Sequence, residues 1–219
     1  MIEKPLNKKS LHKAAHYLST NDKDLARLLN KEGVPPLWGR KQGFATLIRI
    51  ILEQQVSLAS GKAMFKKLQK HIIPFTFQRF HQLGIDYLKS LGVTRQKSAY
   101  LLNVANAIAG GSLNLSDLNK ADDVTAKEML MKIKGIGSWT ADIYLLMALK
   151  RPDIFPSGDI AIVNSIKIIK RLKSHPSKEK SIRIAEKWKP YRSVAARMLW
   201  QHYLSGNLKN FFKKKSLNL

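Results

Sequence analysis

The segment KIKGIGSWTAD, residues 132–142, constrains the fold more strongly than any other part of the chain. Gly135 and Gly137 flank one apolar residue, Ile136, and such a run predicts a tight turn between two helices. Because glycine has no Cβ, the backbone N–H groups of this turn can come close to a partner. Free N–H groups at the start of the second helix suit a phosphate group. The pattern alone also fits an ordinary turn between two packed helices.

Apolar residues recur at helical spacing on both sides of the turn and along most of the chain. We expect helices over residues 124–131 and 139–150, with Ser138 as the N-cap of the second. The last helix is expected over residues 193–204, followed by a lysine-rich basic tail, residues 209–215. No segment keeps the alternation of a strand, so the sequence predicts an all-α protein.

A second motif follows one helix after the turn, in the loop PSGD that ends at Asp159. Proline, serine and glycine predict a loop, and Asp159 then opens the next helix. An aspartate in this position is most often an N-cap, which stabilises a helix by about 1 kcal/mol. Taken alone, this loop predicts a capped helix and nothing more.

The chain has 219 residues, and its 39 Lys and Arg against 15 Asp and Glu give a formal net charge of +24. This charge far exceeds what solubility needs, so a polyanion is the expected partner. Nucleic acid and an anionic membrane both fit, but no apolar run approaches the roughly 20 residues of a membrane span. The first residues show no signal-peptide core. We therefore expect an intracellular protein, in the cytoplasm or nucleoid of a bacterium or in the nucleus of a eukaryote.

The chain contains no cysteine. Disulfide bonds, thiol catalysis and a four-cysteine iron–sulfur cluster are therefore excluded. His12 and His16 stand four residues apart and could share a helix face, but no third metal ligand follows nearby. We expect no metal site and interpret this pair as part of a solvated helix face.

The turn, its run GIGSWTA and the loop PSGD one helix later together resemble the helix-hairpin-helix (HhH-GPD) superfamily of DNA glycosylases. The branch that the chain resembles most is the DNA-3-methyladenine glycosylase II group. Two further segments, FATLIRIILEQQVS at 44–57 and WKPYRSVAARMLW at 188–200, also look like this branch. The resemblance extends from about Phe44 to about Tyr203, and its motifs are specific in combination.

The resemblance implies a single HhH-GPD glycosylase domain, residues 1–219, with an all-α, two-lobed fold. One lobe would be residues 43–150 and contain the hairpin. The other lobe would join residues 1–42 to residues 151–219. The cleft between the two lobes would hold Asp159.

The same resemblance implies a monofunctional DNA glycosylase of base excision repair. It would hydrolyse the N-glycosidic bond of a flipped-out alkylated purine, 3-methyladenine or 7-methylguanine, and leave an abasic site. Its partner would be double-stranded DNA that contains damaged bases, with no membrane involved, and the enzyme would act as a monomer. No cofactor is implied, and a monovalent cation at the hairpin is the one ion that the resemblance allows.

The resemblance also assigns roles to individual residues. Asp159 would be catalytic, because a fixed carboxylate can stabilise positive charge at C1′ and orient the attacking water. Gln55 would be the wedge that fills the gap left by the flipped base, at a position where some relatives carry leucine. Two pocket aromatics of this branch correspond here to Ile143 and Ile160. The base pocket would use Trp139, Trp200 and Tyr144, and DNA would be bound by Lys134, Gly135, Ile136, Gly137 and Ser138.

Two other functions stay open at this level. A bifunctional glycosylase-lyase for oxidised bases needs a lysine that forms a Schiff base with the sugar, and Trp139 occupies the corresponding position. Trp139 therefore disfavours this alternative, and nearby lysines such as Lys134 keep it open. A hairpin module that binds DNA without chemistry would gain from losing a negative charge beside phosphate, so the presence of Asp159 argues against it.

Overall fold

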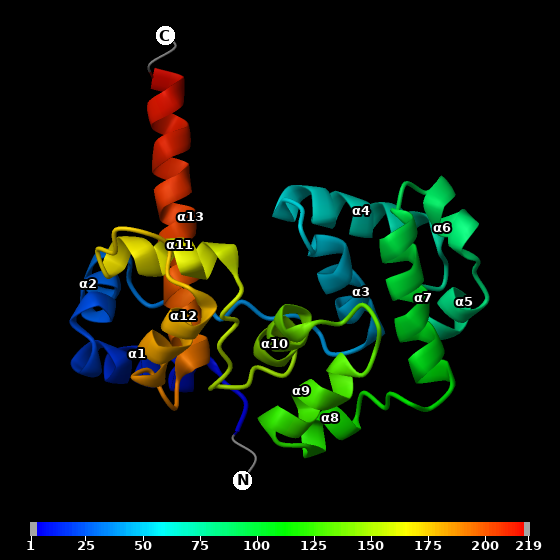
Figure 1. The fold of residues 1–219 in the computed structure, drawn as a ribbon, viewed down its shortest axis with the longest axis horizontal. Helices are drawn as coiled ribbons and strands as arrows, with labels where there is room; N and C mark the ends of the chain where they lie inside the picture. The colour runs from blue at the N-terminus through cyan, green and yellow to red at the C-terminus, as the bar shows by residue number, and fades with distance from the viewer. Residues whose placement is uncertain (1–3, 217–219) are drawn as a thin grey trace. The chain divides into compact units, whose positions relative to one another are not determined.

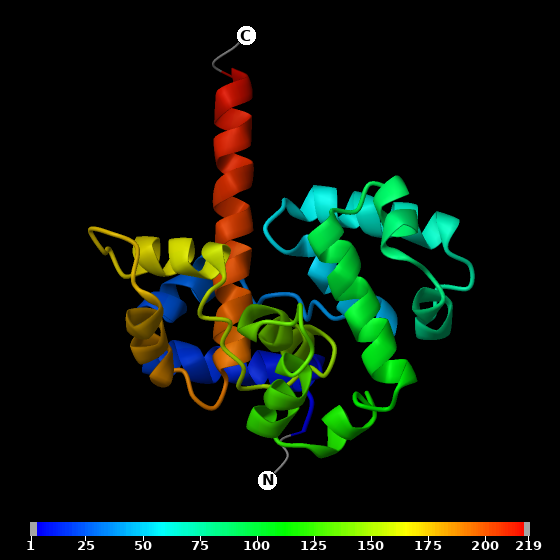
Figure 2. The same ribbon diagram turned by 45° about the vertical axis from the view of Figure 1, so that its right-hand side comes forward.

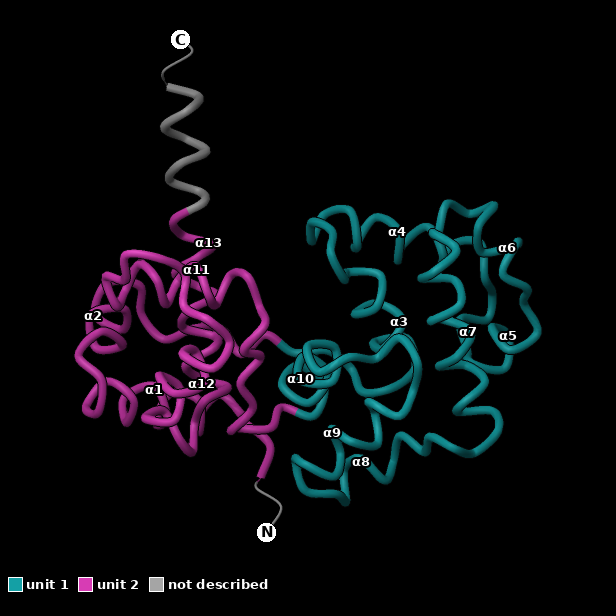
Figure 3. Tube along the Cα trace, viewed as in Figure 1, with its two compact units in different colours: residues 1–2, 39–149 teal, residues 3–38, 150–219 magenta. Residues whose placement is uncertain are grey.

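The computed structural model describes residues 4–216, and the side chains of residues 4–206. Within this range the chain divides into two compact units, shown in Figure 3. The first unit is the continuous segment Gly39–Leu149. The second joins the N-terminal segment that ends at Trp38 with the chain from Lys150 onwards. Segments from the two ends of the sequence thus share one unit, and the hairpin belongs to the other.

Helices alone form both units, and no β-strand occurs among residues 4–216. The predicted all-α class is therefore confirmed. The helices of the first unit (Figure 1) are α3 (Phe44–Glu53), α4 (Leu58–His71), α5 (Phe77–His81), α6 (Ile85–Ser90), α7 (Arg95–Ala109), α8 (Asp117–Lys120), α9 (Asp123–Met131) and α10 (Ser138–Met147). Those of the second unit are α1 (Lys8–Asn21), α2 (Lys23–Glu32), α11 (Ile160–Ile169), α12 (Lys178–Glu186) and α13 (Arg192–Ser216).

Two buried helices organise the first unit. α3 packs against α4, α7 and α10, and its residues Leu47, Ile48 and Ile51 have no exposed surface. In α10, every side chain from Thr140 to Leu146 is buried. A helix that is apolar around most of its circumference is stable only inside a core. These helices therefore fix the segments at their ends, which are the turn between α3 and α4 and the hairpin between α9 and α10.

In the second unit, α13 packs against α1, α2 and α11, and Figure 2 shows its first half among these helices. Asp22, between α1 and α2, connects the N-terminal segment of this unit to its C-terminal segment by hydrogen bonds. Its carboxylate accepts hydrogen bonds from Lys170 Nζ at 2.9 and 2.7 Å and from Trp188 Nε1 at 2.8 Å. Burial alone would raise the pKa of Asp22, but these bonds outweigh it and lower the pKa below its ordinary value. Because Lys170 is the C-cap of α11, this contact anchors the helix that begins after Asp159.

Two of the observed helix ends differ from the predicted ones by more than one residue. α10 ends at Met147 rather than at residue 150, and α13 runs from Arg192 to Ser216 rather than over residues 193–204. The side chains of the basic tail, residues 209–215, lie outside the described residues. Among the described helices, none is long and apolar enough to cross a membrane.

Candidate active site

The hairpin between α9 and α10 depends on Gly135. Its backbone φ is +109°, a conformation that residues with a side chain rarely adopt. A Cβ at this position would lie 2.4–2.7 Å from three atoms of the Tyr100 side chain on α7. The fold of the first unit therefore requires this glycine, whether or not an outside partner approaches it.

Gly137 has the opposite environment. It is exposed, its φ is −88° and its ψ is 177°, and no heavy atom lies within 4 Å of an ideal Cβ. Gly137 is the N-cap of α10, whereas Ser138 is the first helical residue, with its hydroxyl 3.4 Å from Asp142 Oδ2. The prediction that Ser138 caps the helix is wrong, because the extended backbone that a cap needs falls one residue earlier.

The start of α10 offers hydrogen-bond donors to an anion. In the part of the chain that the structure describes, the N–H groups of Gly137 and Ser138 donate to no protein acceptor. Ile136 differs, because its side chain is buried and its N–H donates to Ile133 O at 2.9 Å. Lys134 is exposed and adds positive charge to the same turn. Of the predicted DNA-binding residues, Gly137 and Ser138 therefore present open N–H groups and Lys134 presents a positive charge. A phosphate site at a helix N-terminus requires both.

The hairpin carbonyl groups already take part in hydrogen bonds inside the first unit. Lys134 O accepts from Asn103 Nδ2 at 3.0 Å, and Gly135 O accepts from Gln54 Nε2 at 3.0 Å. A carbonyl oxygen has two lone pairs, so a monovalent cation at the hairpin would share these oxygens with their present donors. The described residues contain no group of three or more His, Cys, Asp or Glu side chains that could hold a metal ion.

Gln55 lies in the turn between α3 and α4. Its φ is +55°, which is uncommon for a residue other than glycine, and its side chain is exposed. The neighbouring Val56 and Leu58 expose 46% and 65% of their surfaces. The predicted wedge therefore lies on an exposed turn, and its neighbours Val56 and Leu58 are of the apolar type that enters base stacks in other DNA-binding proteins.

Asp159 is the N-cap of α11, in the second unit. Its Oδ1 accepts hydrogen bonds from the N–H groups of Ala161 and Ile162, at 3.0 and 3.2 Å. The same oxygen accepts a bond from the indole Nε1 of Trp200, at 3.1 Å. Asp159 is therefore a helix cap, and its carboxylate is also held in one orientation by a side chain from another helix.

Trp200 thus has a contact that its sequence position did not predict. The sequence analysis assigns it to base stacking, and the structure shows its indole N–H bound to Asp159 while part of the side chain stays exposed. Ile160, the residue after Asp159, exposes 74% of its surface. A single exposed apolar side chain is common on protein surfaces, so this exposure alone does not identify a ligand contact.

The predicted pocket residues of the first unit differ in exposure. Trp139, the second residue of α10, is partly exposed and can offer ring surface. Tyr144 has no exposed surface, its hydroxyl oxygen accepts the N–H of Gly43 at 3.0 Å, and burial raises its pKa. Ile143 is buried as well. The assignment of Tyr144 to the base pocket is therefore corrected, because this core residue has no surface to present to a base.

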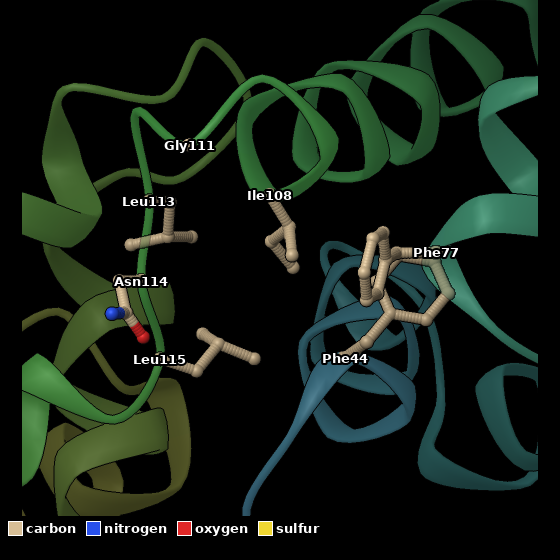
Figure 4. A pocket seen from close by; sticks show the side chains of 7 residues that line it. All are labelled: Phe44, Phe77, Ile108, Gly111, Leu113, Asn114 and Leu115. Carbon is tan, nitrogen blue, oxygen red and sulfur yellow. The ribbon is translucent and has the colours of Figure 1, made fainter.

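A hollow of about 550 Å³ lies elsewhere in the first unit, as Figure 4 shows. Phe44, Phe77 and Ile108 form one part of its wall, and the loop after α7 forms the rest. None of the predicted site residues lines it, and its lining contains no charged side chain. The hollow therefore has no group that could promote cleavage of a glycosidic bond.

Three residues of α7 that hold the hairpin and the Gln55 turn were not predicted from the sequence. They are Lys97, Tyr100 and Asn103. Lys97 and Asn103 reach partners 31 to 45 positions away along the chain. Local periodicity cannot reveal such contacts, because it reports only which face of a helix is apolar.

A family model described as HhH-GPD superfamily base excision DNA repair protein matches residues 48–190. The chain belongs to this family. The matched segment of this HhH-GPD protein contains the Gln55 turn, the hairpin and Asp159. The resemblance noted in the sequence is thereby confirmed.

Curated relatives of this HhH-GPD chain carry related names. It is 30% identical to DNA-3-methyladenine glycosylase of Bacillus subtilis (strain 168) over 181 residues. This alignment covers 77% of this chain and 58% of that relative. It is 27% identical to DNA-3-methyladenine glycosylase 1 of Schizosaccharomyces pombe over 199 residues. This alignment covers 88% of this chain and 87% of that relative. The chain thus spans little more than half of the B. subtilis protein.

Solved structures show the same fold. The S. pombe 3-methyladenine DNA glycosylase in complex with abasic DNA matches with a TM-score of 0.79 and 27% identity, over 86% of this chain and 95% of that one. DNA-3-methyladenine glycosidase from Bacillus halodurans matches with a TM-score of 0.76 and 25% identity, over 87% and 88%. The predicted helix-hairpin-helix glycosylase fold is therefore confirmed.

Proposed function

We propose that this protein is a monofunctional DNA glycosylase of base excision repair that releases alkylated purines and leaves an abasic site. Its family and the names of its relatives support this function. The observation that carries the proposal is the carboxylate of Asp159. Two backbone N–H groups and the indole of Trp200 hold its Oδ1, so the negative charge is fixed in place before a substrate binds.

The proposed reaction needs a fixed negative charge and a water molecule. When the N-glycosidic bond breaks, the base leaves with the bonding electrons and positive charge develops on C1′. Asp159 would stabilise that charge and orient a water molecule. The water oxygen bonds to C1′, and the released proton passes through the carboxylate to solvent. Because 3-methyladenine and 7-methylguanine are cationic within DNA, they leave as neutral bases without taking up a proton.

No step of this scheme calls for a cofactor, and we propose that base release persists in the presence of a chelator. The chain has no cysteine that could hold an iron–sulfur cluster. A chelator-sensitive reaction would contradict the water-only scheme.

DNA binding would use the hairpin and the overall charge. The open N–H groups of Gly137 and Ser138, with the exposed Lys134, suit one phosphate. The net charge of +24 favours association with the remaining phosphates of the duplex. We propose double-stranded DNA with a damaged base as the substrate, bound by a monomer, with Gln55 filling the gap that the flipped base leaves.

The substrate range follows from what the pocket residues can supply. Trp139 is partly exposed, and its ring would attract a cationic base by roughly 0.5–2 kcal/mol. Ile160 adds apolar surface, whereas Tyr144 is buried and adds none. We therefore propose that 3-methyladenine and 7-methylguanine are released, while uracil and 8-oxoguanine are poor substrates. Chromatography of the bases released from randomly methylated DNA tests this range.

The variant Asp159→Asn tests the role of the carboxylate. Asparagine caps helices about as well as aspartate and still accepts hydrogen bonds, so the fold and the contact with Trp200 should persist. Single-turnover base release should fall by more than about 100-fold. DNA affinity, measured by titration of the same preparation, should stay equal or rise. Near-normal release by the variant would remove Asp159 from the mechanism, and a wild-type protein that releases no methylated base would refute the proposed function.

A further inference from the structure

The conformation of Gln55 requires support from its surroundings. Its φ of +55° places a residue with a side chain in the left-handed region, which is energetically unfavourable. Such a conformation persists only where neighbouring groups determine it. The side chain of Gln55 is exposed, so the support has to come from the backbone of the turn.

Lys97 on α7 supplies this support from one side. Its Nζ donates to Leu52 O at 2.7 Å and to Gln54 O at 2.8 Å. These carbonyl groups lie at the C-terminal end of α3, where backbone acceptors lack intrahelical donors and where the helix dipole favours a cation. The two bonds hold carbonyl groups at the start of the turn, and the second fixes the peptide group between Gln54 and Gln55.

Gln54 supplies a second support and joins the turn to the hairpin. Its Nε2 donates to Gly135 O at 3.0 Å and to Thr140 Oγ1 at 2.8 Å. The residue before the predicted wedge is therefore bound to the hairpin and to the first turns of α10. The two loops that would meet DNA form one connected structure within the first unit.

The same face of α7 holds the hairpin as well. Lys97, Tyr100 and Asn103 follow at intervals of three residues, so their side chains lie along one side of the helix. Tyr100 fills the space beside Gly135, and Asn103 Nδ2 donates to Lys134 O at 3.0 Å. Burial lowers the pKa of Lys97 below its ordinary value, and its ammonium group is directed at backbone carbonyls rather than at solvent.

We propose that Lys97 is a positioning residue for base flipping: by bonding Leu52 O and Gln54 O, it fixes the turn that inserts Gln55 into the DNA. This inference rests on the proposed function, because it assumes that Gln55 fills the gap left by the damaged base. Lys97 itself contacts neither the base nor the sugar. It acts through the backbone of Gln54 and Gln55.

The variant Lys97→Met removes the ammonium group and keeps a long side chain. Lys89→Met is the matched control, because it removes one positive charge from an exposed ion pair on α6 of the same unit. On a duplex with 7-methylguanine paired to cytosine, Lys97→Met should lower single-turnover release by about 10- to 100-fold, as expected for lost bonds to a charged group. When the lesion faces thymine, flipping costs less, and the loss should be smaller than about threefold. Lys89→Met should match the wild type on both duplexes.

A double-mutant cycle with Gln55→Ala separates positioning from general damage. If Lys97 acts through Gln55, adding Lys97→Met to Gln55→Ala should change release by less than about twofold. Independent, multiplying effects would overturn the proposal, and so would equal losses on the paired and mispaired duplexes. If Lys97→Met does not fold, as judged by circular dichroism, Gln54→Leu breaks the other support of the turn and carries the same expectation.

A measurement without chemistry distinguishes this inference from the proposed function. In an Asp159→Asn background, the fluorescence of 2-aminopurine in a duplex rises when the base leaves the stack. Lys97→Met should reduce that rise, and Lys89→Met should not. A protein that opens DNA in this Lys97-dependent way but releases no methylated base would refute the proposed activity and support the positioning role. An unchanged rise in the Lys97 variant would overturn the positioning role.

Discussion

Replacing Gly135 with alanine should destabilise the first unit much more than the same replacement at Gly137. An alanine at position 135 must adopt a φ of +109°, at a cost of about 1–2 kcal/mol. Its Cβ would also approach the Tyr100 side chain to 2.4–2.7 Å, and overpacking of this kind costs about 1–3 kcal/mol. The expected loss is therefore about 2–5 kcal/mol in the free energy of unfolding. At Gly137 the backbone is unstrained and no atom lies within 4 Å, so the cost is only that of replacing glycine by alanine at an N-cap, about 0.5–1 kcal/mol.

Stability and DNA binding should respond differently to these two variants. Denaturant unfolding followed by circular dichroism measures stability, and fluorescence anisotropy with a labelled duplex measures affinity. Gly137→Ala should keep most of the wild-type stability and weaken binding to all DNA sequences alike, because its methyl group stands beside the open N–H groups of the helix start. Gly135→Ala should lose stability first, and any loss of affinity should follow from that.

A rescue variant identifies the cause of the Gly135 effect. Tyr100→Ala in the Gly135→Ala background removes the ring that the new Cβ would meet. It should restore part of the lost stability and leave the cost of the positive φ. Wild-type stability of Gly135→Ala, or a double variant no more stable than expected from independent losses, would refute the contact with Tyr100 as the constraint on this hairpin.

Three further predictions concern base release, covalent trapping and stability in acid. Trp200→Phe keeps an aromatic ring but removes the donor to Asp159, so single-turnover base release should fall about tenfold or more with little change in DNA affinity; an unchanged rate would leave Trp200 a packing or stacking residue. Borohydride should trap no protein–DNA adduct, because the resemblance implies that Trp139 stands where lyase-competent members of the family carry lysine; a stable adduct would indicate that a lysine such as Lys134 attacks the sugar. The pKa of Asp22 is lower in the folded than in the unfolded chain, so its contribution to stability is present above the ordinary carboxyl pKa and is lost as the pH falls through the folded value. Asp22→Asn should therefore reduce stability at neutral pH and flatten its decline in acid, as measured by unfolding at several pH values.

Local signals in the sequence located most of the fold. The helix before the hairpin was expected over 124–131 and is observed at Asp123–Met131, and the helix that follows Asp159 begins at Ile160. Both starts depend on an aspartate that caps its own helix, which is a contact within a few residues. Ser138 is the exception, because the preceding glycine adopts the extended conformation of a cap and leaves the serine inside the helix.

The sequence could not distinguish the buried residues of the candidate site from the exposed ones. Tyr144 and Trp139 lie on the same helix and are both aromatic, so their types and spacing do not distinguish a core residue from a partly exposed one. In the structure the N–H of Gly43 satisfies the hydroxyl of Tyr144, a partner 101 positions away in the chain. That contact allows the tyrosine to be fully buried, since a buried hydroxyl without a partner would destabilise the core.

The apolar pattern of α7 explains why this segment is helical, but it does not reveal what the helix does. Its apolar positions Leu101 and Val104 are buried and explain the helix. The neighbouring face carries Lys97, Tyr100 and Asn103, which bind the Gln55 turn and the hairpin across long sequence separations. A glycosylase that opens a duplex needs a wedge and a strand grip at a fixed spacing, since a small misplacement of either weakens the geometry that the reaction requires. Both loops are bonded to one rigid helix, so that spacing is set by the core of the first unit and does not have to be created when DNA binds.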